Sequence, residues 1–391
     1  MKIEQRWRVL AALCVARVAL GFQFQTVAAT APVLSERLGF DSAQIGWLVG
    51  LYLLPGIALA LPGGMLGARF GDKRVALTGL ALMVAGGLGF AMSGGIVAAS
   101  VARAVMGVGA VVLIVLLVKM VTDWFAGKEL VLAMSILINT WPIGIGLALL
   151  SQGALAQGVS WQAASVATAV LAALGLLSVL FGYKPAPGAP AVQRVELRGL
   201  SRREWNLLGA TSLAWATYNA GFVLFVAFLP IYFVDKGMSI VSAGSVTALN
   251  TILVIVSVQA GGVLVQRFGH ADAVVYAGLA GTALAAIGIL TTSSPLPWIV
   301  LSGLAGGLPA AVLVSLPGEF LRPESRSTGM GIFYIGFYIG MAVAPPVAGA
   351  IAVRTASSAA PIWMAVACIG LTAAAFALTR LLQGSARARK S

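Results

Sequence analysis

The sequence predicts an all-helical integral membrane protein with twelve transmembrane helices, and three observations support this fold class. Of the 391 residues, 60% are hydrophobic and only 9% are charged, whereas a soluble domain carries about 25% charged residues. Apolar stretches recur along the whole chain, each near the roughly 20 residues that a helix needs to cross a bilayer core. A glycine-rich loop also returns about halfway along the sequence, which indicates an internal duplication.

The apolar stretches define twelve expected spans, six in each half of the chain. We expect them at about residues 9–33, 44–67, 75–93, 96–118, 131–155, 161–182, 206–233, 243–265, 273–292, 297–318, 329–352 and 359–381. The first span is too long for the apolar core of a signal peptide and lacks a small-residue cleavage site after it, so we expect it to remain as a helix.

The repeated loop supports a division into two halves. Each copy has a glycine pair, then an arginine, a phenylalanine and a further glycine. These residues are Gly63, Gly64, Arg69, Phe70 and Gly71, with Arg74 after them, and Gly261, Gly262, Arg267, Phe268 and Gly269. We therefore predict a six-helix bundle over residues 1–183, a polar, proline-rich linker over 184–205, and a second six-helix bundle with a short tail over 206–391.

Lysine and arginine are distributed unevenly between the two sides of the predicted membrane. The segments on the side of both termini hold 20 of the 25 basic residues, the opposite side holds 3, and two lie within spans. This asymmetry follows the positive-inside rule and predicts that both termini are cytoplasmic. The net charge of +13 is thus explained by topology and by contact with anionic lipids, and we expect no nucleic-acid partner.

The motifs resemble those of the major facilitator superfamily of secondary transporters. That family has a signature loop, Gly-x3-Asp-Arg-x-Gly-x-Arg/Lys-Arg/Lys, between its second and third helices. Both copies here resemble it, except that the acidic position is Ala68 in the first and Gln266 in the second. The sequence Arg103-x3-Gly107-x-Gly109 also resembles the family's fourth helix. Within the superfamily the general pattern is similar to the bacterial cyanate and nitrate/nitrite porters, although the arginines that nitrate porters carry on helices 2 and 8 are missing.

This resemblance implies two pseudo-symmetric bundles that rock about a central site, which opens alternately to either side of the membrane. Helices 1, 4, 7 and 10 would line that site. The resemblance also suggests residues that govern gating and conformational change, through turns, kinks and close helix packing. They are Gly64, Arg69, Gly71, Arg74, Gly107, Gly109, Pro142, Arg267, Gly269 and Pro345.

The chemistry of the predicted spans indicates an anionic substrate. Arg17 and Arg103 lie within spans, where a charge costs at least about 2.5–3.5 kcal/mol, and all acidic residues fall at helix ends or in loops. An organic anion would compensate both charges, and the planar guanidinium fits a carboxylate. The alternative is that the arginines are structural, with Arg103 capping backbone carbonyls. Phe24 shares a helical face with Arg17.

A second wall of the site is expected on the seventh span. Trp215, Tyr218, Asn219 and Phe222 share one helical face, and we expect the first three to bind substrate opposite the arginines. Asn250, Tyr334 and Tyr338 are further cavity candidates of the same kind. The alternative for all of these side chains is ordinary helix packing.

Other functions fit the sequence less well. A proton-coupled efflux antiporter for drugs or metabolites would need an acid or histidine in the membrane, and a receptor or scaffold would need no charges in a cavity. No phosphate-binding loop, metal-ligand cluster or catalytic set is present, so we expect neither an enzyme nor a cofactor. We predict a monomeric transporter of the bacterial inner membrane. Its substrate, direction of transport and coupling ion are left open.

Overall fold

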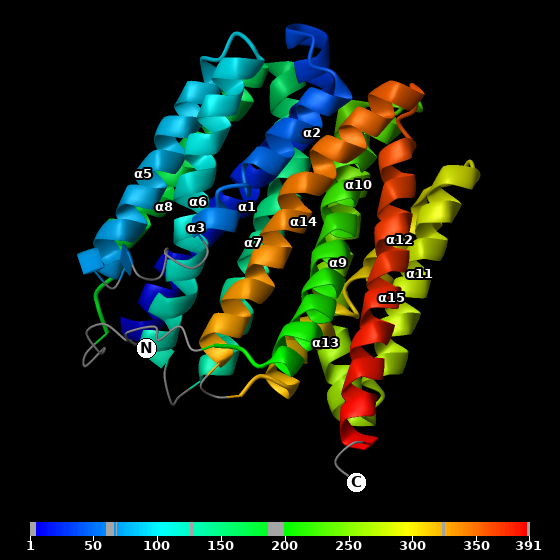
Figure 1. Ribbon diagram of the computed structural model, residues 1–391. Coiled ribbons are helices and arrows are strands. Elements are labelled where there is room, and N and C mark those ends of the chain that lie inside the picture. The colour runs from blue at the N-terminus through cyan, green and yellow to red at the C-terminus, as the bar shows by residue number, and fades with distance from the viewer. Residues whose placement is uncertain are drawn as a thin grey trace.

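The structure is a computed structural model that describes residues 5–59, 66–67, 69–125, 129–186, 199–322 and 325–388. In this part of the chain, twelve helices are long and apolar enough to cross a membrane, which confirms the predicted number of spans. Figure 1 shows them running side by side, with both ends of the chain at the same end of the molecule.

The first half contains the helices of the first six spans. They are α1 (Gln5–Leu38), α2 (Ser42–Leu51) with α3 (Gly56–Leu59), α5 (Asp72–Ala91), α6 (Ile96–Phe125), α7 (Leu130–Gly158) and α8 (Trp161–Gly182). The second half contains the last six. They are α9 (Arg202–Asp235), α10 (Ile240–Phe268), α11 (Ala271–Thr291), α12 (Leu296–Gly306) with α13 (Ala310–Ser315) and the 3₁₀ turn η1 (Leu316–Glu319), α14 (Arg326–Thr355) and α15 (Ala360–Ala388).

Side-chain caps fix where two of these helices begin. Asp41 caps α2, because its carboxylate accepts from the backbone N–H of Gln44 at 2.8 Å while the Gln44 side chain accepts from the Asp41 N–H at 3.0 Å. Ser201 and Glu204 form the same reciprocal cap on α9. The last residues of the predicted linker therefore form the first turn of α9.

Two of the transmembrane segments are broken. In the tenth, α12 ends at Gly306 and α13 begins at Ala310, where Pro309 lacks a backbone donor. At the C-terminal end of α12, the N–H of Gly307 donates to the hydroxyl of Ser257 at 2.8 Å. The second segment breaks between α2 and α3 at Pro55. Gly306, Gly307 and Pro309 favour a bend in the tenth span on sequence grounds. The break in the second span was not predicted.

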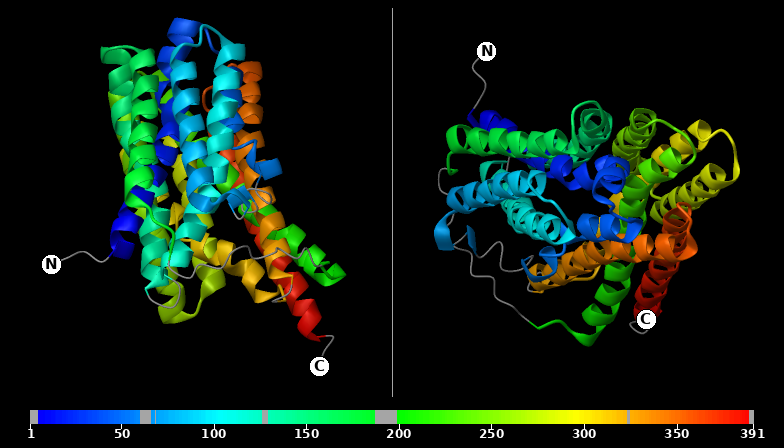
Figure 2. Two further views of the ribbon diagram at one scale, coloured as in Figure 1. Left: turned by 90° about the vertical axis from the view of Figure 1, so that its left-hand side faces the viewer. Right: turned by 90° about the horizontal axis from the view of Figure 1, so that it is seen from above.

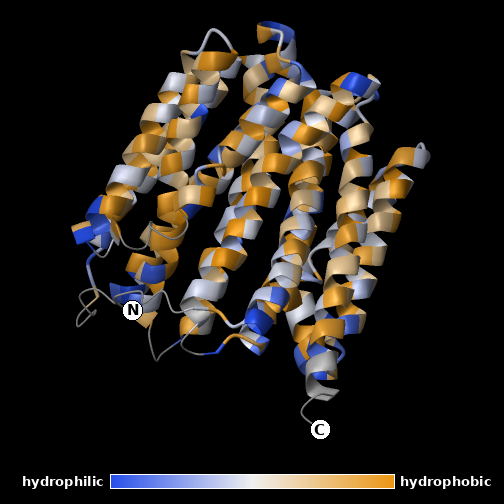
Figure 3. Ribbon diagram, viewed as in Figure 1, coloured by the Kyte–Doolittle hydropathy of each residue, from blue (hydrophilic) through white to orange (hydrophobic). Residues whose placement is uncertain are grey.

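The outer surface of the bundle is apolar over its middle and polar at both ends, as Figure 3 shows. Large side chains such as Val97 and Phe181 are 75% and 78% exposed, which would be costly in water. In a bilayer these side chains contact lipid, and the backbone polar groups are satisfied within the helices.

The two halves meet through the ends of helices that lie away from the chain termini. Gly46 of α2 lies against the backbone of Pro345 on α14, so closely that a Cβ atom would collide with the proline carbonyl. Gly244 of α10 lies in the same way against the carbonyl of Leu149 on α7. The view from above in Figure 2 (right) shows the helices of the two halves side by side. Glycine thus allows the backbones of the two halves to touch at this end of the molecule.

At the opposite end, each half ties the start of its first helix to the loop between its fourth and fifth segments. In the first half, Arg6 forms an ion pair with Glu129 at 2.8 Å. In the second half, Glu204 forms an ion pair with Arg322 at 3.0 Å. The positions correspond in the duplicated halves, but the acid and the base have exchanged places.

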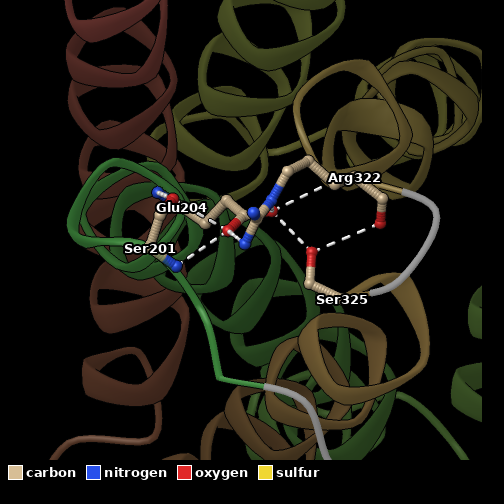
Figure 4. A network of polar contacts seen from close by, with 4 residues as sticks. All are labelled: Ser201, Glu204, Arg322 and Ser325. Atoms are coloured by element: carbon tan, nitrogen blue, oxygen red, sulfur yellow. Dashed lines mark hydrogen bonds and ion pairs between the residues drawn. The ribbon is translucent and has the colours of Figure 1, made fainter.

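In the second half, the acid of the pair is deeply buried and accepts hydrogen bonds from three residues (Figure 4). Glu204 is only 3% exposed. One carboxylate oxygen accepts from the Arg322 backbone N–H at 3.1 Å and from the Ser325 hydroxyl, and the other accepts from the Ser201 N–H and hydroxyl, both at 2.8 Å. The sequence placed this acid in a solvated linker, whereas the structure buries it because every lone-pair direction finds a donor.

Candidate functional site

Arg103 of α6 is almost fully buried, and backbone carbonyls of two neighbouring helices hold its guanidinium. The Nε donates to the carbonyl of Leu48 at 3.0 Å, Nη1 donates to that of Gln23 at 2.8 Å, and Nη2 donates to that of Phe24 at 2.6 Å. The guanidinium carbon also lies 4.4 Å from the ring centre of Tyr52. Three carbonyls and a ring face therefore stabilise the charge without a carboxylate, and Arg103 fastens α1 and α2 to α6.

Arg17 of α1 is in the opposite situation. Its Nε and Nη1 atoms are shielded from solvent and have no hydrogen-bond partner among the described residues. The groups within electrostatic reach are the phenols of Tyr338 and Tyr334 on α14 and the thiol of Cys14 on its own helix. Ordinary phenols and thiols are neutral at pH 7. Arg17 therefore places an uncompensated positive charge between the two halves.

Phe24 is buried among side chains of the first half. Its ring centre lies 5.4 Å from that of Trp141 and 5.8 Å from that of Tyr52, and only 1% of its surface is exposed. Its contact with substrate remains a prediction. One residue further along α1, the amide of Gln25 donates to the carbonyl of Val226 on α9 at 2.6 Å and links the two halves. Sequence reasoning missed Gln25, although a glutamine within an apolar span was a signal that could have identified it.

Six aromatic rings from α9 and α14 form one continuous cluster, which we call the aromatic wall. Its members are Trp215, Tyr218, Phe333, Tyr334, Phe337 and Tyr338. Trp215 is stacked on Tyr218 at 5.6 Å and 17° between ring planes, and on Phe333 at 6.0 Å and 14°. The indole N–H of Trp215 is buried without an acceptor among the residues that the structure describes. The structure thus joins two side chains predicted on the seventh span to the two tyrosines beside Arg17.

The other polar atoms of the predicted second wall are engaged within the second half. The Tyr218 hydroxyl donates to the carbonyl of Gly306 at 2.6 Å, at the break of the tenth segment. The Asn219 amide donates to the carbonyl of Trp215, on its own helix, at 2.8 Å. A cavity of about 40 Å³ lies beside Tyr218, with Asn250 among its lining residues. This volume is close to that of a single water molecule and is too small for an organic substrate.

The last glycine of each copy of the glycine-rich loop has a positive φ angle. Gly71 precedes α5 with φ of 90°, and Gly269 ends α10 with φ of 72°, a region that side-chain-bearing residues rarely adopt. The guanidinium carbons of Arg69 and Arg267 lie 5.3 Å and 5.6 Å from the ring centre of the phenylalanine that follows each of them. Arg74 is exposed in the first turn of α5. The roles of these residues in gating remain a prediction, and Gly64 lies outside the described residues.

An ion-pair cluster adjoins the first loop and was not predicted. Lys119 of α6 forms ion pairs with Asp72 at the start of α5 and, at 2.9 Å, with Asp123 on its own helix. Asp72 follows the loop directly, so the cluster joins the loop to α6. Charges of opposite sign at two helix ends on the same side of the membrane were the sequence feature from which this cluster could have been predicted.

The remaining predicted gating residues lie where helices approach closely. A Cβ atom at Gly107 or Gly109 would collide with the backbone of the turn after α2 or of α5. Pro142 lies inside α7, which packs along α1. Pro345 lies inside α14, against Gly46 of the other half. Pro345 is therefore at a contact between the halves, whereas the other three are within the first half.

Comparison with known proteins gives consistent results. A family model described as Major Facilitator Superfamily matches residues 13–301 and 242–391. The probable sulfoacetate transporter SauU of Cupriavidus necator is 22% identical, over 96% of this chain and 94% of its own. The 3-(3-hydroxy-phenyl)propionate transporter of Escherichia coli K12 is 27% identical, over 84% and 83%. The hexuronate transporter of Bacillus subtilis is 22% identical, over 59% and 58%.

Solved structures share the fold. A bacterial homolog of the human lysosomal transporter Spinster, in an inward-facing and unoccupied conformation, superposes with a TM-score of 0.77 at 17% identity over 98% of both chains. A mutant of the nucleoside transporter NupG superposes with a TM-score of 0.74 at 13% identity, over 97% of this chain and 99% of its own. At these identities the likeness concerns the fold alone.

Proposed function

This chain belongs to the major facilitator superfamily of membrane transporters, and we propose that it carries a small organic anion across the membrane by alternating access. It is a transporter and not an enzyme. The observation that supports the proposal is the guanidinium of Arg17, whose Nε and Nη1 atoms are buried without a hydrogen-bond partner among the described residues.

The free energy of this charge explains why an anion is the expected substrate. A buried donor without a partner costs about 1–3 kcal/mol, and Arg17 has two such donors on a charged group. A carboxylate can accept two parallel hydrogen bonds from a guanidinium and cancel its charge at the same time. A lipophilic cation would instead add to the repulsion. The site is therefore selective for anions on electrostatic grounds.

The named relatives support this substrate class. Sulfoacetate, 3-(3-hydroxy-phenyl)propionate and hexuronates differ in size and polarity, but each carries a carboxylate. A carboxylate is what the free guanidinium recognises, whereas the rest of the ligand would contact other side chains.

In this proposal the two arginines have different roles. Arg17 contacts the anion, whereas Arg103 keeps α1 and α2 in place through their carbonyls. The Phe24 ring packs against Tyr52 and Trp141 and so helps to hold the same part of α1 in place. Trp215, Tyr218 and Asn219 shape the second half of the site. Rocking of residues 1–183 against 206–391, with the outer contact at Gly46 and Pro345 opening and closing, would give access from either side.

The membrane setting belongs to the same proposal. The excess of lysine and arginine on the side of both termini supports a cytoplasmic location for them in a bacterial inner membrane. Anionic lipid headgroups would contact these basic segments. No second copy is required to complete the site, so a monomer is sufficient.

Binding to the purified full-length protein tests the proposal. We expect small carboxylates to raise the apparent melting temperature, because a ligand at 100 times its dissociation constant adds about 2.7 kcal/mol. Arg17→Gln should abolish this stabilisation. Arg8→Gln is the matched control, since Arg8 lies exposed near the start of the same helix. Stabilisation of Arg17→Gln by the same anions would refute the proposal, and stabilisation by lipophilic cations alone would favour an efflux antiporter.

A further inference from the structure

We infer from the structure that the transported anion is an aromatic monocarboxylate, whose ring lies on the aromatic wall while its carboxylate binds Arg17. This inference rests on the proposed function and specifies the substrate class. Two features support it: the aromatic rings within reach of Arg17, and the small number of polar groups and positive charges among the described residues of the site.

Two tyrosines of the aromatic wall lie within electrostatic reach of Arg17. Tyr334 and Tyr338, the phenols within electrostatic reach of Arg17, contact Phe333 and Phe337 at ring-centre distances of 5.7 Å and 5.2 Å. Those two phenylalanines in turn stack on Trp215. A ligand held at Arg17 by its carboxylate would therefore extend toward this ring surface.

Part of this wall is open to a ligand. Tyr334 is 39% exposed, and Trp215 and Phe337 are partly buried, whereas Phe333 and Tyr338 are closed off at 0% and 2%. The buried Phe333 contacts Trp215 and Tyr334, and the buried Tyr338 contacts Phe337, so the buried rings restrict the orientation of the more exposed ones. Flat, immobilised ring faces with few rotatable bonds favour a flat ligand, because stacking adds to the burial of apolar area.

The polar groups of the wall are too few for a polyhydroxylated anion. The Tyr218 hydroxyl is bonded to a backbone carbonyl, and the Asn219 amide is bonded to its own helix. The groups left in the wall are the Trp215 indole N–H, which has no acceptor among the described residues, and the Tyr334 and Tyr338 hydroxyls. They are fewer than the hydroxyls of a hexuronate, so at least one hydroxyl of a sugar acid would lose its water and stay unpaired, at a cost in free energy. The wall therefore disfavours a hexuronate.

The positive charge available is that of one guanidinium. Arg103 is the other arginine within the membrane, and its guanidinium is occupied by three carbonyls and the Tyr52 ring. A short dianion such as a sulfonated carboxylate would leave its second charge against neutral rings. A monoanion matches the charge of Arg17, and an aromatic substituent matches the wall.

A pair of ligands that differ only in their ring tests this inference. We expect 3-phenylpropionate to bind the purified full-length protein about 2- to 12-fold more tightly than 3-cyclohexylpropionate by isothermal titration calorimetry. The two share charge, chain length and similar volume, but only the first has a flat aromatic face. Glucuronate and sulfoacetate should bind more weakly than either.

Substitutions in the aromatic wall test whether it causes the preference for the aromatic acid. Trp215→Leu and, separately, Phe337→Leu should bring the two affinities together while binding still depends on Arg17. Trp363→Leu is the matched control, because Trp363 of α15 is 48% exposed and lies outside the aromatic wall. It should leave the preference intact.

The outcomes separate this inference from the proposed function. If binding requires Arg17 but the two ring types bind equally, or glucuronate or sulfoacetate binds best, the inference is overturned and the anion transporter stands. If no anion binds in an Arg17-dependent way, both fail. A preference for the aromatic acid that disappears in either wall variant supports the inference.

Discussion

The two intramembrane arginines should respond in opposite ways to the same substitution. Arg103→Met removes a guanidinium that holds three backbone carbonyls, whereas Arg17→Met removes one whose Nε and Nη1 have no partner among the described residues. Methionine keeps a long, flexible side chain in both places, so lost volume is similar. The difference between the variants therefore measures the polar interactions and not the packing.

The magnitudes follow from the contacts. Hydrogen bonds to a charged group contribute about 1.5–3 kcal/mol each, so the three bonds of Arg103 amount to about 4.5–9 kcal/mol. Removing the buried charge recovers several kcal/mol of desolvation. We therefore expect Arg103→Met to lower the free energy of unfolding by about 2–4 kcal/mol. Arg17→Met should raise it by about 2–6 kcal/mol, because two unsatisfied buried donors disappear, each at a cost of about 1–3 kcal/mol.

Apparent melting temperatures of the ligand-free protein in one detergent, at one scan rate, measure this contrast. At about 1.2 °C per kcal/mol, for 391 residues with an unfolding entropy of about 2.1 cal/mol/K per residue, the two variants should differ by at least about 5 °C, on opposite sides of the unmodified protein. Arg8→Met, at the exposed start of α1, should not shift the midpoint. The reasoning is refuted if Arg17→Met is destabilised as much as Arg103→Met, since Arg17 would then have structural partners too.

Two further substitutions probe the ends of the bundle. Glu204→Gln should lower the free energy of unfolding by about 1–2 kcal/mol, which is less than for a fully buried pair because Arg322 is 57% exposed. A double-mutant cycle with Arg322→Gln, measured by denaturant titration, should show coupling between the two substitutions. Simple additivity of their effects would contradict the ion pair. Gly46→Ala should separate the outer ends of α2 and α14, because the new methyl group meets the carbonyl of Pro345. Distances between spin labels at those two helix ends should lengthen in Gly46→Ala. They should stay unchanged in the control Gly370→Ala, where a Cβ atom meets open space. Equal distances in the two variants would contradict the contact between Gly46 and Pro345.

The sequence allowed the fold to be predicted because its determinants are local. A span of apolar residues is recognised without knowing its neighbours, and the glycine-rich loop marks the turn in both halves. The positive φ angles of Gly71 and Gly269 agree with that pattern. The break at Pro55 also had a local signal, since proline within a span removes a backbone donor.

The candidate site was only partly predictable, because partners come from distant segments. Arg17 and Arg103 look equivalent in the sequence, and only the carbonyls supplied by α1 and α2 distinguish them. Glu204 meets an arginine 118 residues away, which no local pattern shows. Its reciprocal cap with Ser201, three residues earlier, was a local signal for the helix start, although not for burial.

The division of the site between the halves predicts a mode of transport. Arg17 belongs to the first half, and two of the three titratable groups within its electrostatic reach, Tyr334 and Tyr338, belong to the second. Closing the site without substrate therefore buries an unpaired charge, at about 2.5–3.5 kcal/mol. A barrier of that size would slow the return of the empty carrier about 70- to 400-fold.

Bound anion removes this cost, because it pairs with the guanidinium in the closed state. Liposomes preloaded with the transported anion should therefore take up labelled anion at least about tenfold faster than empty liposomes, at the same external concentration and without a proton gradient. Equal initial rates would show that the empty carrier closes freely. The charge of Arg17 would then be compensated by a group that moves into the site when the halves rock.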